Sequence, residues 1–180
     1  MAYSSNCLLT AGYSLPCKGI AGIQEVYIGN WNSTSLTYTV SAATASLNQI
    51  TAFTGTTQSF YKFQQPIETA GFTNNGNFSD QNGTAYFDQV LEITITPVDY
   101  NTTNIVNTLS VGKWRVIILD QNGNYFLMGK TNPVTVSGLA GGVGKAYGDV
   151  NGYTITFTGK EPAVLTSISS AAALSVISLV

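Results

Sequence analysis

One continuous stretch of the chain, residues 80–130, constrains the fold more than any other. It predicts a strand at residues 86–96, because apolar side chains recur at every second position in its later half. The apolar face of this strand consists of Leu91, Ile93 and Ile95. Pro97 cannot donate a ladder hydrogen bond, so we expect the strand to end there.

A helix and a central strand follow within the same stretch. Residues 98–111 place three apolar side chains at helical spacing, and these are Ile105, Val106 and Leu109. The run WRVIIL at residues 114–119 is short, apolar and rich in β-branched residues, which is typical of a strand buried on both faces. The stretch therefore predicts strand, helix and strand in unbroken succession.

The rest of the chain predicts further short strands and little helix. These strands are expected at residues 23–28, 36–40, 50–54, 57–64, 131–137 and 152–159. We expect 50–54 and 57–64 to pair around Gly55, and we expect the glycine-rich residues 138–148 to form a mobile connection. The prediction is a single, mostly β domain at residues 1–162, a small β-barrel or sandwich with one short flanking helix. It has an N-terminal arm at residues 1–22, and an uncharged apolar tail follows at residues 163–180.

Residues 67–96 predict a long β-hairpin arm. Its two polar and aromatic strands meet at Asn82-Gly83, a pair that favours the positive φ angles of a type I′ turn. A two-stranded ribbon with few aliphatic residues is marginal in water, so we expect its tip to dock on another subunit. The expected contact residues are Phe72, Phe78, Gln81, Asn82, Gly83 and Thr84. The tetrapeptide DQNG at residues 80–83 recurs at residues 120–123, which predicts a second hairpin.

The low charge of the chain favours self-assembly over a lone monomer. Only 9% of residues are charged and the net charge is −2, against roughly a quarter charged residues in ordinary soluble domains. Solubility usually depends on net charge, so a surface of this kind is better suited to being covered by neighbouring subunits.

The composition gives little support for catalysis, a cofactor or a metal. The chain has no His, and its two cysteines, Cys7 and Cys17, form neither a zinc pattern nor a disulfide framework. They either pair across the loop between them or remain free thiols. The residues at the start of the chain do not form a secretory signal, which predicts synthesis in the cytoplasm.

Three motifs resemble binding or catalytic sites and are each better explained otherwise. GGVGK at residues 141–145 lacks the first Gly and the Ser or Thr of a phosphate-binding loop, and residues 120–131 lack the sixth-position Gly and twelfth-position Glu of a calcium loop. Asp88 and Glu92 share a strand face but lie about 13 Å apart, too far for a retaining glycosidase pair and beyond the usual inverting spacing. Strand aromatics leave a carbohydrate-binding module as an alternative function.

Neither a membrane anchor nor a nucleic-acid site is expected. The 18 uncharged residues 163–180 are interrupted by serines and have no basic flank on their C-terminal side. We expect an extended arm or a final strand there instead, covered by a neighbouring subunit. The seven basic residues are scattered singly, so tight binding of nucleic acid is not expected.

The chain resembles small virion structural proteins of tailed phages that infect Bacteroidetes, and among them the tail tube subunits. The resemblance covers residues 1–162. It is carried by Cys7-Leu-Leu-Thr-Ala-Gly-Tyr13 with Cys17, by Gly22-Ile-Gln-Glu-Val-Tyr-Ile-Gly29, by Phe60-Tyr61, by Ile67-Glu-Thr-Ala-Gly-Phe72, by Asn82-Gly-Thr84 and by Gly144-Lys-Ala-Tyr-Gly-Asp149 leading into Asn151-Gly-Tyr-Thr-Ile-Thr-Phe-Thr-Gly-Lys-Glu-Pro162. The polar helix segment at residues 101–104 and the tail after Pro162 depart from that pattern.

The resemblance implies the fold shared by phage tail tubes and the type VI secretion tube, assembled into stacked and usually hexameric rings. The implied function is a virion tail conduit for double-stranded DNA during ejection, with other tail proteins as partners and with synthesis in the host cytoplasm. Other tail or head-tail connector roles remain open. A conduit must not hold DNA, so we expect Ser, Thr, Asn, Asp and Glu to line the bore, with Lys and Arg turned outward or paired.

Overall fold

The structure, a computed structural model, describes residues 19–32, 37–42, 49–54, 59–170 and 172–173. Cys7, Cys17, Gly55 and residues 1–18 of the expected arm lie outside the described residues. The described part is mostly β-strand with one helix, which confirms the predicted class. Its strands form two sheets that do not close into a barrel.

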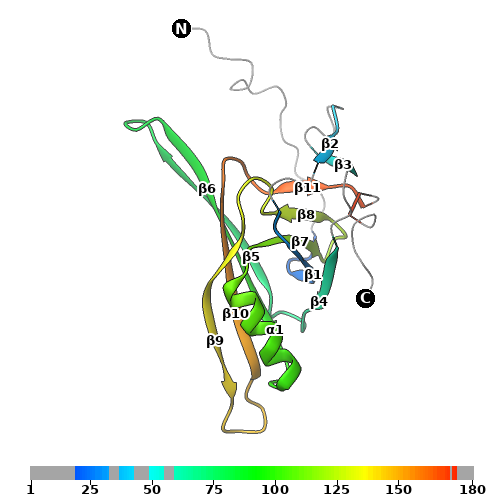
Figure 1. Ribbon diagram of the computed structural model, residues 1–180, viewed down its shortest axis with the longest axis vertical. Coiled ribbons are helices and arrows are strands. Elements are labelled where there is room, and N and C mark those ends of the chain that lie inside the picture. The colour runs from blue at the N-terminus through cyan, green and yellow to red at the C-terminus, as the bar shows by residue number, and fades with distance from the viewer. Residues whose placement is uncertain (1–18, 33–36, 43–48, 55–58, 171, 174–180) are drawn as a thin grey trace.

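The larger sheet has seven strands in the order β2-β3-β11-β8-β7-β1-β4 (Figure 1). Its strands are β1 (Ile23–Asn30), β2 (Thr37–Val40), β3 (Ile50–Thr54), β4 (Phe60–Gln64), β7 (Trp114–Asp120), β8 (Tyr125–Met128) and β11 (Thr166–Ile168). Neighbouring strands are antiparallel except β11 and β3, which are parallel. As predicted from WRVIIL, β7 lies inside the sheet and is buried along almost its whole length.

The smaller sheet has four antiparallel strands in the order β5-β6-β10-β9. They are β5 (Gly71–Ser79), β6 (Thr84–Ile95), β9 (Thr135–Val143) and β10 (Asn151–Glu161). The long hairpin predicted at residues 67–96 is therefore confirmed as β5 and β6, and it projects beyond the rest of the molecule (Figure 1).

A shared apolar core joins the two sheets. It contains Val26, Ile28, Val116 and Ile118 from the larger sheet, and Leu91, Ile93, Ile155 and Phe157 from the smaller one. The predicted face of β6 is confirmed, since Leu91 and Ile93 are fully buried and Ile95 packs against the same cluster. A second cluster, which includes Tyr27, Ile50 and Phe60, covers the other face of the larger sheet. Phe60 and Phe63 lie on opposite faces of β4, because they pack against different clusters.

The helix α1 (Tyr100–Val111) begins at a capping box. The Asp99 side chain accepts a hydrogen bond from the Thr102 backbone N–H, and the Thr102 hydroxyl lies 2.9 Å from the Asp99 nitrogen. Val106 and Leu109 are buried in the shared core, as their spacing predicts, whereas Ile105 is 41% exposed. Val106 and Leu109 occupy the side of the helix that packs against the sheets, so Ile105 lies outside the core although it shares their spacing.

Two sequence predictions about strands need correction. The strands β3 and β4 do not pair around Gly55, since β3 pairs with β2 and β11 while β4 pairs with β1. The glycine-rich run at residues 138–148 is not a connection throughout, because β9 continues to Val143 against β10. Glycine lowers strand propensity, but the ladder to β10 supplies partners for this backbone.

The turn at the end of the long hairpin also differs from the prediction. Residues 80–83 form a four-residue turn between Ser79 and Thr84, which pair across the ladder. Gly83 has a φ of 60°, whereas Asn82 does not have a positive φ. A type I′ turn requires positive φ at both central residues, so that assignment was wrong.

The segment after Pro162 is joined to the domain. The strand β11 inserts between β3 and β8, and Ala172 and Ala173 are buried in the second cluster. The described part of residues 163–180 therefore contains the expected final strand, but β3 and β8 of the same chain flank it where cover by a neighbour was expected. Among the described residues no helix is long and apolar enough to cross a membrane.

The second DQNG turn joins β7 and β8, as predicted. Its Asp120 carboxylate accepts hydrogen bonds from the backbone N–H groups of Asn122 at 2.8 Å and Asn124 at 2.7 Å, and Gly123 supplies the positive φ of 80°. Burial raises the pKa of Asp120, but hydrogen bonds from Asn124 and Asn122 outweigh it and hold the pKa below its ordinary value.

This shift predicts an acid-sensitive contribution to stability. Because the folded pKa of Asp120 is depressed, its contribution is fully present above the unfolded pKa of about 4 and is lost as pH falls through the folded value. Asp120→Asn should flatten the fall in unfolding free energy over that acidic range, measured by denaturant titration. Asp80→Asn, at the exposed equivalent position of the first turn, is the control. Identical pH profiles for wild type and Asp120→Asn would contradict the assignment.

Candidate functional site

The outer face of the four-stranded sheet is polar and nearly uncharged. Side chains alternate along each strand, so the positions between the core residues of β6 and β10 point away from the core. In register across this face lie Thr73, Asn75, Asn77, Asp88, Val90, Glu92, Thr154, Thr156, Thr158 and Lys160. We call this the polar face.

Only three of these residues carry charge. The Lys160 ammonium lies 3.0 Å from the Asp88 carboxylate and 4.7 Å from the centre of the Tyr86 ring, and Asn77 donates to Asp88 at 2.7 Å. The hydrogen bond to Asp88 raises the pKa of Lys160, with attraction to the same carboxylate in support. Glu92 is exposed, so the two carboxylates and one ammonium leave the polar face with a net charge of about −1 at neutral pH.

Both edges of this sheet are open among the described strands. β5 pairs only with β6, and β9 pairs only with β10. Each edge strand has nine residues, and neither sequence, GFTNNGNFS or TVSGLAGGV, contains a charged residue or a proline. Soluble proteins usually protect a free edge with such residues. These edges lack those protections, so we expect a partner strand to cover them.

The hairpin tip, residues 77–86, extends past the body of the domain. The pairing of β10 with β6 ends at Phe87, so beyond that point β6 has only β5 beside it. Phe78 is 69% exposed and makes an edge contact with Phe87, with 5.6 Å between ring centres. Gln81, Asn82, Gly83 and Thr84 are all exposed, which is compatible with their predicted role as contact residues.

Phe72 does not belong with the other predicted contact residues. It lies at the base of the hairpin, opposite Leu91, and packs against the shared core. Phe72 therefore has packing partners within its own chain, because the body of the domain covers that part of the ribbon. A substitution there would disturb folding as well as any contact between subunits.

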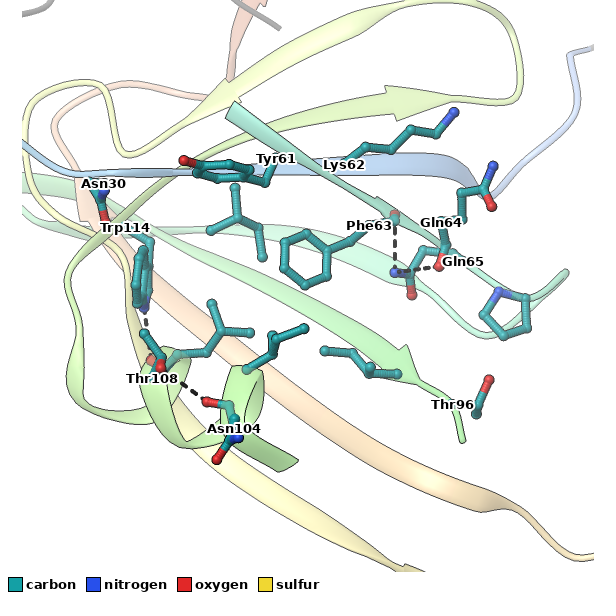
Figure 2. Close-up of a pocket in the computed structure, with 15 residues that line it drawn as sticks. Asn30, Tyr61, Lys62, Phe63, Gln64, Gln65, Thr96, Asn104, Thr108 and Trp114 are labelled. Carbon is teal, nitrogen blue, oxygen red and sulfur yellow. Dashed lines mark hydrogen bonds between the residues drawn. The ribbon is translucent and has the colours of Figure 1, made fainter. Parts of the chain in front are cut away.

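A wide apolar groove lies between β4 and α1. Its volume is about 830 Å³, and Figure 2 shows Phe63 and Trp114 in its wall, with α1 along one side. Tyr61, which is 51% exposed, and Ile105, which is 41% exposed, also line it. Sequence reasoning missed this groove, because its walls come from β1, β4, the end of β6, α1 and the start of β7, and several of these are distant along the chain. We call it the β4–α1 groove.

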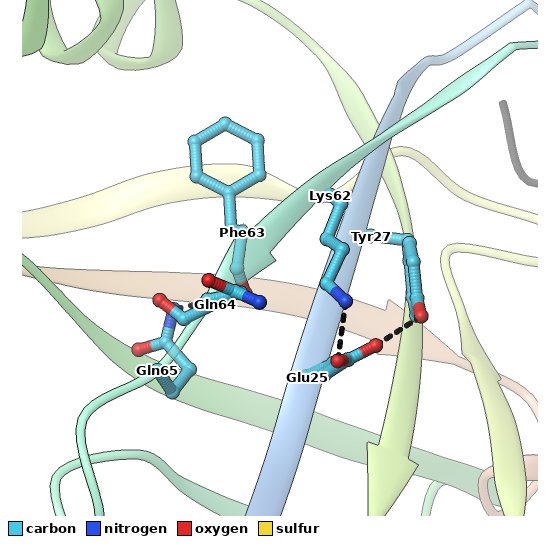
Figure 3. A network of polar contacts seen from close by, with 6 residues as sticks. All are labelled: Glu25, Tyr27, Lys62, Phe63, Gln64 and Gln65. Carbon is cyan, nitrogen blue, oxygen red and sulfur yellow. Dashed lines mark hydrogen bonds and ion pairs between the residues drawn. The ribbon is translucent and has the colours of Figure 1, made fainter. Parts of the chain in front are cut away.

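Among the described residues that line the groove, one is charged, and another contact holds it. Lys62 forms an ion pair with Glu25 at 2.5 Å, and the Tyr27 hydroxyl donates to the same carboxylate (Figure 3). Burial raises the pKa of Glu25, but the hydrogen bonds from Lys62 and Tyr27 outweigh it and lower that pKa; burial and Glu25 together raise the pKa of Tyr27. The groove therefore presents an apolar surface with amide groups and little net charge.

The described residues contain no arrangement typical of a metal centre. They hold no group of three or more His, Cys, Asp or Glu side chains placed to bind a metal ion. A second hollow of about 600 Å³ on the polar face is lined by Asp88, Lys160 and Thr158 among others, and none of its described lining residues is aromatic. A sugar-binding site usually offers such a ring for stacking.

Comparison of the chain with family models, with curated proteins and with solved structures finds no match in any of the three.

Proposed function

We propose that this chain is a structural subunit of a phage tail tube, which assembles into rings that stack around a bore for double-stranded DNA. The observation that carries the proposal is the four-stranded sheet, with two open edges free of charge and a polar outer face of low charge. The resemblance of residues 1–162 to tail tube subunits supports the same function.

The geometry of the sheet suits ring formation. Because all three strand pairs are antiparallel, β5 and β9 run in opposite directions at the two edges. When β9 of one copy lies beside β5 of the next, the two strands are again antiparallel, and both are nine residues long. Repeated around an axis, this heterologous contact closes into a ring and leaves no open edge in the four-stranded sheet.

In such a ring the polar face is turned toward the bore. Its Thr and Asn side chains form hydrogen bonds with water, and its small negative charge does not attract phosphates. Asp88 neutralises Lys160, so in this proposal the basic residue of the polar face is paired within its own chain. In this proposal DNA slides through without tight binding, and the chain acts in the virion tail with other tail proteins and has no enzymatic role.

The proposal predicts self-assembly of the purified chain. Size-exclusion chromatography over a range of concentrations should show oligomers, and negative-stain electron microscopy should show rings or tubes. Open edges without charge give the physical reason, because they remain uncovered in a monomer. A clean monomer at high concentration, with no rings, would contradict the proposal and favour the alternative of a binding module.

A further inference from the structure

The hairpin tip and the β4–α1 groove are complementary surfaces on one chain. The tip presents an exposed aromatic ring, Phe78, and the groove presents an apolar hollow with exposed side chains at Tyr61 and Ile105. We propose that the tip of one copy seats Phe78 in the β4–α1 groove of a second copy, and that this contact stacks the copies head to tail. The inference rests on the proposed function, because both require self-assembly.

The positions of the two surfaces favour contact between copies. The tip lies at one end of the long axis of the molecule, whereas α1 and β4 lie in its other half (Figure 1). The tip therefore cannot fold back into the groove of its own chain. Contact between two different surfaces is heterologous, so each added copy leaves one tip and one groove available and the assembly grows along the axis.

The charges of the two surfaces also match. Within residues 77–86 the only charged side chain is Asp80, which lies in the turn. Of the groove's lining residues in the described part of the chain, Lys62 alone is charged, and Glu25 neutralises it. Two nearly uncharged surfaces lose little hydration of charged groups when they meet, whereas a highly charged partner would gain nothing from this groove.

The contact between one tip and one groove is small, so it can join copies only when several such contacts form together between two rings. Ten residues at the end of a ribbon bury less than the roughly 1,200–2,000 Å² of a stable interface. A single tip in a single groove is therefore weak, and a ring that carries several tips binds the next ring by the combined effect of all of them. Loss of one buried aromatic ring should weaken each contact by roughly 10- to 100-fold.

Disulfide trapping between copies tests the assignment. In a Cys7→Ser/Cys17→Ser background, Phe78→Cys combined with Ile105→Cys should give a ladder of cross-linked multimers on a non-reducing gel. The matched control combines Phe78→Cys with Val111→Cys, which lies on the same helix, is 87% exposed and does not line the groove. The control should give no ladder. Equal ladders, or no ladder from the Ile105 pair, would overturn the inference.

Two further variants separate this inference from the proposed function. Phe78→Ser should leave single rings in negative-stain images and raise the protein concentration needed for stacking by at least about tenfold. Suppose that wild type forms tubes, that Phe78→Ser forms them at the same concentration, and that the cross-linked ladder is absent. The tip contact is then wrong, while the tube function stands. If wild type forms neither rings nor tubes, both proposals fail.

A different occupant of the groove would also be detected. Ile105→Cys in the chain that retains Cys7 and Cys17 would cross-link to one of those residues if the N-terminal segment of a copy filled the groove. That product would overturn the assignment of the hairpin tip. Its absence, together with the ladder from the Phe78 pair, would support it.

Discussion

Ile168→Ala should lower the free energy of unfolding by about 2–5 kcal/mol, although Ile168 belongs to a three-residue strand near the end of the chain. Ile168 is 2% exposed and pairs with Ile50 on β3 and Tyr125 on β8. Its removal leaves a cavity in the second cluster, between strands that come from opposite halves of the chain. Thermal unfolding should show a fall in Tm of about 4–20 °C for a domain of this size.

Val164→Ala provides the matched control for this variant. Val164 lies four residues earlier in the same segment and is 58% exposed, so its truncation should change stability by less than about 0.5 kcal/mol. If both variants unfold like wild type, β11 does not hold β3 and β8 together. The domain boundary would then return to Pro162, as the sequence alone indicates.

The parts of the fold that the sequence predicts well are those set by local pattern. Three such patterns are the alternation in β6, the spacing of Val106 and Leu109 in α1, and the apolar run of β7. Each depends only on which side chains of a single element are buried. Such local patterns do not predict which strands pair when the strands are distant in the sequence. β3 and β4 look like neighbours because they are close in sequence, yet four other strands lie between them in the sheet.

The remaining errors have related causes. β9 continues through Gly138, Gly141 and Gly142 because β10 supplies a ladder, and no local propensity indicates that partner. Phe72 and Phe78 look equivalent in the sequence of β5, but only Phe72 lies where the body of the domain covers the hairpin. The polar face followed from the alternation of β6 and β10, whereas the β4–α1 groove required the tertiary fold.

The largest effect that we expect is on DNA binding when the polar face is made basic. Wild-type rings should bind DNA weakly even at low salt, with a Kd above about 1 μM, because the polar face offers no unpaired cation. Glu92→Lys combined with Thr158→Lys adds two cations per copy on this face, at positions that are not directly opposite each other. In a ring of several copies these cations contact many phosphates, so affinity at low salt should rise by at least about 1,000-fold.

The topology of the DNA tells whether the added lysines line a bore. A preformed tube can admit the end of a linear duplex but not a closed circle, so Glu92→Lys/Thr158→Lys tubes should bind linear DNA and exclude circular DNA of the same sequence. The matched control, Asn101→Lys/Asn107→Lys, places two lysines at exposed positions of α1, which packs on the core side of the same sheet. That control should bind both forms alike.

Electron microscopy should first establish that each variant still assembles. The conduit proposal fails if wild-type tubes bind linear DNA with a Kd below about 1 μM, because the bore would then hold DNA. It also fails if Glu92→Lys/Thr158→Lys tubes bind circular DNA as tightly as linear DNA, because DNA would then reach the polar face from outside the tube.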